Sequence, residues 1–218
     1  MFLTITNHKQ PKIWEMFFKG HESKYNIYYH PKSKVDVTQK LFKKCIIKNI
    51  AETKRMYILD ANLALMKAAY EADNDNYKFI LVTDSCIPIR TFDYIYDKLI
   101  MDNRSYIEWW KTHPFNDFAN RYDIAVKETG FKFPHNKYKK HSAYFILNRE
   151  YMKEIVDHKI NNTKEYHFFV NLPAGDEHFL SLLSGKQENE PNIINYTVTG
   201  ADWEYRDCIK EKDRQVFD

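Results

Sequence analysis

The stretch that most constrains the fold is residues 77–90, which read YKFILVTDSCIPIR. Its consecutive apolar residues at 79–82 predict a strand that is buried on both faces. The strand ends abruptly in three small polar residues at 83–85, and Pro88 prevents the strand pairing from continuing. Ligands of open α/β sheets bind beyond the carboxyl ends of central strands, so this triplet is a candidate floor of a binding site. An ordinary strand followed by a polar turn explains the same residues.

Strand and helix patterns alternate along the rest of the chain, which predicts a single α/β domain over residues 1–218. Residues 110–140 have no clear period, and we expect an irregular, substrate-facing loop region with some local helix there. Strands are predicted at residues 2–6, 25–29, 78–83, 143–147 and 193–199, with an edge strand at 106–109. Helices are predicted to begin at Pro11 and to cover residues 53–72, 92–101, 149–157 and 176–183.

The composition narrows the classes of partner. With 33 basic and 30 acidic residues, the net charge is +3, too near neutral to indicate a nucleic acid or an anionic membrane. The longest apolar runs are too short to span a bilayer, and the first residues lack the apolar core of a signal peptide. The three widely spaced cysteines indicate neither a metal site nor a disulfide framework, which fits a reducing compartment. We therefore expect a soluble protein.

A second feature is the segment GDEH at residues 175–178. Asp176 has the side chain of a typical N-cap, which would make Glu177 the first helical residue. The positive end of the helix dipole would keep a carboxylate there ionised. An ionised carboxylate suits a general base that accepts a proton from a hydroxyl. An ordinary capped helix with an acidic first turn is the alternative interpretation.

Several further stretches, in chain order, resemble the core-2/I-branching family of glycosyltransferases, which are β-1,6-N-acetylglucosaminyltransferase-like enzymes, and especially its plant-like and microbial branch. They cover nearly the whole chain except residues 110–138. These stretches are FLTITNHKQP followed by WEMFFKGHESKYNIYYHP, the block ILDANLALMKAAYEADNDNYKFILVTDSCIPIRTFDYIYDKL, HSAYFILNREYMKEIV, GDEHFLSLL and NYTVTGADW.

The resemblance implies a GT-A-type nucleotide-sugar-binding fold, with a mixed, mostly parallel sheet flanked by helices. It implies inverting transfer of a sugar from a UDP-sugar, such as UDP-N-acetylglucosamine or UDP-xylose, to a hydroxyl of a glycan or other acceptor. It also implies that no metal cofactor is needed, because the family's better-known members place basic residues on the diphosphate instead.

The resemblance assigns roles to individual residues. Glu177 matches the family's catalytic base. The predicted nucleotide-sugar-binding residues are Asn7, His8, His30, Asp60, Thr83, Asp84 and Ser85, with Arg206 and Lys210 as the candidates for the diphosphate. The residues that we expect to line the acceptor and donor cleft are Ser142, Tyr144, Asp176 and Trp109.

The sequence itself gives little support for a metal. Asp73-Asn74-Asp75 has the D-x-D form that nucleotide-sugar transferases often use for a divalent cation. It precedes the strand, however, where Asp and Asn are ordinary turn residues, and the far end of the strand offers only the carboxylate of Asp84. A diphosphate leaving group would then depend on basic side chains. The candidates are Lys139, Lys140, Arg206, Lys210, Lys212 and Arg214.

Two other function classes stay open at this point. One is a catalytically inactive nucleotide-sugar- or glycan-binding module of the same fold, since fold alone does not establish activity. The other is binding of single-stranded nucleic acid through Tyr and Lys, against which the near-neutral charge argues. Because the disulfides and the amino-terminal anchor of secretory members are not reproduced, we expect a cytoplasmic protein of bacterial or viral origin.

Overall fold

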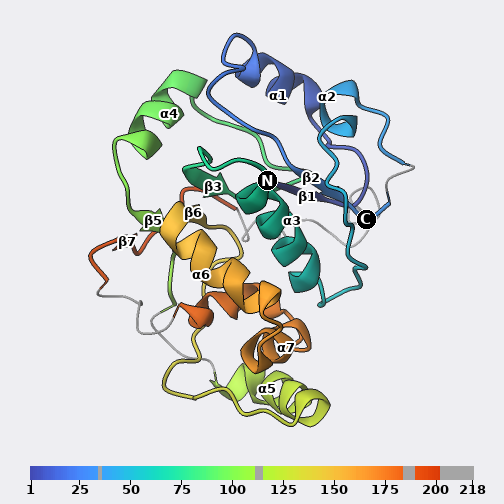
Figure 1. Ribbon diagram of the computed structural model, residues 1–218, viewed down its shortest axis with the longest axis vertical. Helices are drawn as coiled ribbons and strands as arrows, with labels where there is room; N and C mark the ends of the chain where they lie inside the picture. The colour runs from blue at the N-terminus through green and yellow to red at the C-terminus, as the bar shows by residue number, and fades with distance from the viewer. Residues whose placement is uncertain (34–35, 111–114, 184–189, 202–218) are drawn as a thin grey trace, which may run out of the picture.

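The computed structural model describes residues 1–33, 36–110, 115–183 and 190–201 (Figure 1). Its strands form a three-stranded parallel sheet of order β2-β1-β4 and a four-stranded sheet of order β3-β6-β5-β7. In the second sheet β6 is antiparallel to both of its neighbours, whereas β5 and β7 are parallel. The strands are β1 (Phe2–Thr4), β2 (Tyr29–Pro31), β3 (Lys78–Ile80), β4 (Val82–Thr83), β5 (Ser105–Tyr106), β6 (Ile146–Asn148) and β7 (Ile193–Ile194).

The strand predicted at residues 78–83 is present and joins the two sheets. It is interrupted at Leu81, so that β3 pairs with β6 while β4 pairs with β1. The Leu81 N–H donates to the carbonyl of Phe145 at 3.4 Å. Phe79, Leu81 and Val82 are buried, as their unbroken apolar run predicts. One strand thus connects both sheets in a mixed, mostly parallel arrangement, and the predicted α/β class is confirmed.

Helices cover the sheets in two groups. In Figure 1, α3 and α6 cross in front of the sheets, while α5 and α7 lie together at the end of the molecule farthest from α1 and α4. The α3–α6 and α5–α7 pairs are in direct contact. The helices are α1 (Pro11–Phe18), α2 (Lys40–Lys43), α3 (Leu59–Ala72), α4 (Phe92–Ile100), α5 (Phe115–Thr129), α6 (Arg149–Ile160) and α7 (Lys164–Val170).

Aromatic residues make up 16% of the chain, and many of their side chains are buried. A cluster of rings fills the space between α1, α2 and the first sheet, and its members include Phe2, Trp14, Tyr29 and Phe42. The ring centroids of Phe2 and Trp14 lie 4.9 Å apart, and those of Tyr29 and Phe42 lie 4.8 Å apart. These separations fall in the range that stabilises aromatic pairs beyond their buried area. A second, larger core packs α3, α6 and α7 on the other sheet.

Several predicted boundaries differ from those of the structure. The strand predicted at residues 25–29 is displaced to β2, because its register with β1 begins only at Tyr29. The helix predicted from residue 53 begins at Leu59, since Met56 has a φ of 68° that a helix cannot contain. The predicted edge strand at 106–109 is reduced to β5, which lies between β6 and β7 rather than at an edge.

The second half of the chain contains more helix than predicted. Helix α5 occupies half of the region expected to be irregular. Helix α7 was missed, although the side chain of its N-cap Thr163 accepts a hydrogen bond from the Tyr166 N–H. The helix predicted at 176–183 is two 3₁₀ turns, η1 (Gly175–Glu177) and η2 (Phe179–Leu182). Asp176 is therefore not an N-cap: that position belongs to Ala174, which has a φ of 56°.

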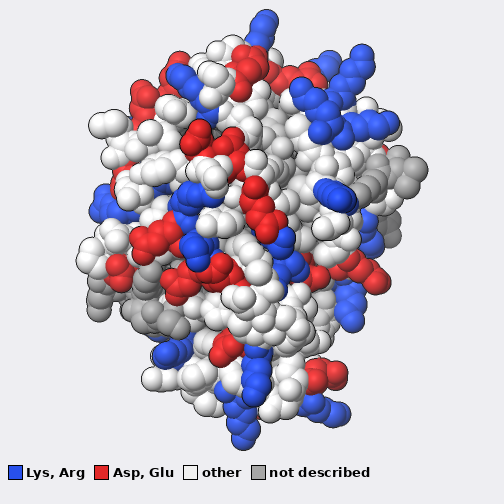
Figure 2. Space-filling view, in the orientation of Figure 1, with Lys and Arg blue, Asp and Glu red and all other residues white. Residues whose placement is uncertain are grey.

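The surface carries charges of both signs. On the face shown in Figure 2, Lys and Arg alternate with Asp and Glu over the middle of the molecule, and a group of basic side chains lies over α2, which carries Lys40 and Lys43. Within the described ranges, no helix is both long and apolar enough to cross a bilayer.

Candidate functional site

The predicted nucleotide-binding residues gather at one edge of the first sheet. Because β1, β2 and β4 are parallel, their carboxyl ends meet there. The loops that follow β1 and β4 are linked directly, since the Lys9 N–H donates to the Asp84 carbonyl at 2.8 Å. Helix α3, which carries Asp60 in its first turn, contacts β2. The residues at this edge are Asn7, His8, His30, Asp60, Thr83, Asp84 and Ser85.

The two histidines of this edge are buried, with 2% of His8 and 0% of His30 exposed. The His8 ring stacks on Phe42, and its Nδ1 accepts from the Gln10 N–H at 2.9 Å. Burial lowers the pKa of His8, so the ring is neutral. The His30 Nε2 accepts from the Ala51 N–H at 3.0 Å. Both rings hold the protein's own loops, and their direct contact with a nucleotide stays a prediction.

Asn7 and Asp60 are likewise tied to protein partners. The Asn7 Oδ1 accepts from the Thr38 N–H at 2.9 Å. The Asp60 carboxylate accepts hydrogen bonds from Lys159 and, at 2.8 Å, from the Tyr166 hydroxyl. Burial alone would raise the pKa of Asp60, but these hydrogen bonds and the Lys159 charge outweigh it and lower the pKa. Asp60 therefore anchors α3 to α6 and α7.

The polar end of β4 meets the predicted cleft segment. The Thr83 Oγ1 lies 3.4 Å from the Tyr144 hydroxyl and 3.3 Å from the Cys86 sulfur. Burial raises the pKa of Tyr144, so this hydroxyl stays protonated. Ser142 adjoins it, since the Ser142 Oγ accepts from the Tyr144 N–H at 3.3 Å. Sequence reasoning placed these residues in one site, and the structure brings them together across 61 positions of the chain.

Glu177 lies at the end of η1, beside this segment. The Glu177 carbonyl accepts from the His141 N–H at 2.8 Å, which fixes η1 next to Ser142. The Glu177 side chain is 32% exposed, and its Oε2 lies 3.1 Å from the Lys140 Nζ. A partly exposed carboxylate, held beside the predicted cleft segment by a backbone contact, can accept a proton from a bound hydroxyl.

The His141 ring links the segment of Ser142 to η2, the 3₁₀ turn that follows η1. The ring is buried, its Nε2 accepts from the Leu180 N–H at 3.1 Å, and its Nδ1 lies 2.7 Å from the Ser142 carbonyl. The Nδ1 therefore carries the proton and donates to that carbonyl. Burial lowers the pKa of His141 to about 3, so the ring is neutral across the physiological range.

Asp176 is partly buried beside Glu177. Burial and, to a smaller extent, the neighbouring Glu177 charge raise the pKa of Asp176 to about 6, although Arg121 and Lys140 act in the opposite direction. The folded pKa lies above the ordinary value of 3.8. Asp176 therefore favours folding while it is protonated, and this stabilisation is lost as the pH rises through 6.

Asp176→Asn should stabilise the fold by about 1–2 kcal/mol at pH 8, because the variant avoids the cost of burying an ionised carboxylate. At about pH 2, well below the ordinary pKa of 3.8, the gain should vanish, since Asp176 is then protonated in both the folded and the unfolded chain. Urea unfolding at both pH values measures the difference. Equal stabilisation at the two pH values would contradict this account of Asp176.

The two neighbouring tryptophans differ in exposure. Trp109 is 2% exposed and packs edge-on to the buried His141 ring at 5.6 Å, and its place in the lining of the cleft stays a prediction. Trp110 is 47% exposed, and the Lys140 Nζ lies 3.9 Å from the centre of its ring. The sequence already indicated that only one of the two side chains would be exposed, because neighbouring residues of an extended segment point to opposite sides.

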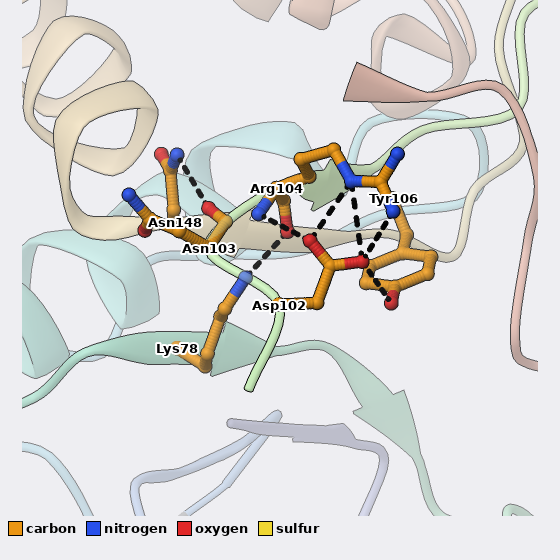
Figure 3. Close-up of polar contacts among 6 residues, drawn as sticks. All are labelled: Lys78, Asp102, Asn103, Arg104, Tyr106 and Asn148. Atoms are coloured by element: carbon orange, nitrogen blue, oxygen red, sulfur yellow. Dashed lines mark hydrogen bonds and ion pairs between the residues drawn. The ribbon is translucent and has the colours of Figure 1, made fainter. Parts of the chain in front are cut away.

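A hollow of about 510 Å³ is lined by the end of α4, the residues that follow it and Tyr106 of β5, and Glu177 is not among its lining residues. Figure 3 shows its central contacts: the Asp102 carboxylate accepts from the Arg104 guanidinium at 2.8 Å and from the Tyr106 hydroxyl at 3.2 Å. Hydrogen bonds from Arg104 hold the pKa of Asp102 well below its usual range. Lys78 donates to the Arg104 carbonyl. These groups form their hydrogen bonds with one another, so the contacts stabilise the start of β5 and indicate a structural role.

The described residues contain no group of three His, Cys, Asp or Glu side chains that could hold a metal ion. The D-x-D segment is the turn after α3, where the Asp73 carboxylate accepts from the Asp75 N–H at 2.8 Å. The predicted diphosphate candidates Arg206 and Lys210 lie outside the described residues.

The protein-family model "Core-2/I-Branching enzyme" matches residues 1–216. The curated glycosyltransferase BC10 of Oryza sativa subsp. japonica is 22% identical over 246 residues, which cover 98% of this chain and 59% of BC10. The chain thus spans less than two thirds of that relative's length. The mixed sheet flanked by helices agrees with a GT-A-like glycosyltransferase fold. Because the family model matches nearly every residue, the chain belongs to the Core-2/I-Branching enzyme family of glycosyltransferases.

Proposed function

We propose that this chain is an inverting glycosyltransferase that moves a sugar from a UDP-sugar to a hydroxyl acceptor, with Glu177 as the general base. Membership of the family supports glycosyl transfer. The observation that carries the proposal is the position of Glu177: its backbone carbonyl accepts from the His141 N–H, and its side chain is partly exposed. This places Glu177 beside the segment of Ser142 and Tyr144, which in turn meets the polar end of β4.

In the proposed reaction the acceptor hydroxyl lies between Glu177 and the anomeric carbon of the donor. Its oxygen forms a bond to that carbon as the bond from carbon to the diphosphate oxygen breaks. The hydroxyl proton moves to Glu177, and the bonding electron pair leaves with UDP. One displacement from the face opposite the leaving group inverts the configuration, through an oxocarbenium-like transition state of the kind that glycosidases use.

The donor and the source of positive charge are part of the same proposal. We expect N-acetylglucosamine or xylose as the sugar, with Thr83, Asp84 and Ser85 beneath it. The end of β4 supplies one carboxylate, Asp84, which is a poor site for a hard cation on its own. We therefore propose metal-independent transfer in which Arg206 and Lys210 neutralise the diphosphate. The cytoplasmic location and the bacterial or viral origin stay predictions.

A thermal-shift panel of UDP-sugars, with manganese or with EDTA, tests this proposal, because a ligand that binds only the folded protein raises its melting temperature. UDP-N-acetylglucosamine or UDP-xylose should raise it equally in both conditions. A shift that needs manganese would contradict the metal-independent mechanism. Binding without any release of UDP would favour the alternative of an inactive nucleotide-sugar-binding module.

A further inference from the structure

We propose that Lys140 is a positioning residue for Glu177: its ammonium group, held on the Trp110 ring, binds Oε2 of Glu177 and leaves Oε1 to take the acceptor proton. This inference rests on the proposed function of Glu177. It assigns to Lys140 a role different from that of a diphosphate ligand, for which its charge alone also made it a candidate.

The geometry around Lys140 is that of a fixed cation. The Lys140 side chain is 10% exposed, whereas lysine side chains are mostly exposed. Its Nζ lies 3.1 Å from the Glu177 Oε2 and 3.9 Å from the centre of the Trp110 ring. A cation that is close to an aromatic face and partly removed from water is held more firmly than one in a surface pair. The flexible lysine stem is thereby confined beside η1.

The backbone holds the two partners in register. Lys140 precedes His141, whose N–H donates to the Glu177 carbonyl at 2.8 Å. The Trp110 N–H donates to the Lys140 carbonyl at 3.0 Å. Main-chain hydrogen bonds therefore join Trp110 to Lys140 directly, and they join Lys140 to Glu177 through the adjacent His141. Such support is what keeps a reacting group within the narrow geometry that catalysis needs.

The chemistry of an inverting displacement separates the two possible roles of Lys140. The base and the departing diphosphate stand on opposite faces of the anomeric carbon. A cation in contact with the base therefore lies on the acceptor side, away from the charge that develops on the diphosphate. An ammonium group at 3.1 Å from Oε2 instead fixes the orientation of the carboxylate.

Among the described residues, the other titratable groups near Glu177 do not supply a second cation that would orient its carboxylate as Lys140 does. Asp176 is adjacent and of the same sign, and the Arg121 charge acts on Asp176. His141 is neutral, because burial lowers its pKa to about 3. The helices packed behind η1 approach through Leu59 and the Phe169 backbone, which lie nearest to Gly175.

Lys140→Met keeps the apolar stem and removes the charge. We expect kcat for UDP release from UDP-N-acetylglucosamine or UDP-xylose to fall at least 10-fold, since a misplacement of about 1 Å can cost about 10²-fold. The KM for the donor and the Kd for UDP should stay within about 2-fold. Lys140→Arg should restore most of the rate, because it returns a cation to the Trp110 ring. Lys132→Met, which removes an exposed lysine from the same segment, is the matched control.

A Lys140→Met variant with unchanged kcat would overturn the proposal, as would a rise of more than 10-fold in the Kd for UDP with kcat intact, which would mark a diphosphate ligand. Melting temperatures of both variants show whether the fold is intact, and rescue by Arg identifies a charge effect even if Lys140→Met is destabilised. If Glu177→Gln keeps its activity, the proposed function fails. If Glu177→Gln is inactive while Lys140→Met is normal, only the role of Lys140 fails.

Discussion

Glu177→Gln should reduce sugar transfer by about 10²- to 10⁴-fold, the usual cost of losing a general base. The amide keeps the size of the side chain but cannot take a proton from the acceptor hydroxyl. The loss should appear in kcat, while the binding of UDP should be unchanged, because Glu177 acts on the acceptor side. Initial rates of UDP release and a UDP titration by calorimetry measure both quantities.

The matched control for this variant is Glu15→Gln, which makes the same change at an exposed position of α1. It should be as active as the wild type. Transfer by Glu177→Gln within about 3-fold of the wild-type rate would remove Glu177 from the mechanism. A large loss of UDP binding in that variant would point to a role in holding the donor.

Gly175→Ala should affect both stability and activity. A Cβ at residue 175 would lie 2.1 Å from the Phe169 carbonyl oxygen and 3.3 Å from the Leu59 Cδ2. The first of these distances is impossible, and a backbone atom cannot rotate away as a side chain can. The clash can be removed only by a shift of η1, which carries Glu177. We expect a loss of about 1–3 kcal/mol of stability and a fall of about 10²-fold in kcat from the displaced base.

Gly200→Ala is the matched control, because a Cβ there has no neighbour within 4 Å. Its stability should change by less than about 0.5 kcal/mol. Thermal unfolding of both variants, followed by circular dichroism, provides the comparison. Equal melting temperatures for Gly175→Ala and the wild type would show that η1 is not held by the contact with Phe169.

Patterns that depend on local composition could be predicted from the sequence. The apolar run at 79–82 predicted the buried strand, Pro11 marked the first residue of α1, and the alanine-rich stretch before residue 73 predicted α3. Each of these signals is contained in a few neighbouring residues. Their boundaries depended on tertiary partners: β2 begins where β1 can pair with it, and α3 begins after the backbone turn at Met56.

The site was only partly accessible from the sequence. Motif resemblance placed Glu177, Ser142 and Tyr144 in one cleft, and the structure brings their segments together through His141. Resemblance could not show that the predicted nucleotide ligands His8 and His30 are buried, nor that Trp110 rather than Trp109 is at the surface. It also could not pair Lys140 with Glu177, because a contact between residues 37 positions apart depends on how η1 folds back.

The stereochemistry of the product tests the central claim most directly. UDP-N-acetylglucosamine and UDP-xylose carry the sugar in an α linkage, and proton NMR during the reaction reports the anomeric configuration of the first product formed. One displacement with Glu177 as the base predicts a β-configured product, absent when Glu177→Gln is used. An α-configured first product would contradict the mechanism, because retention needs a second step at the anomeric carbon that Glu177 alone does not provide.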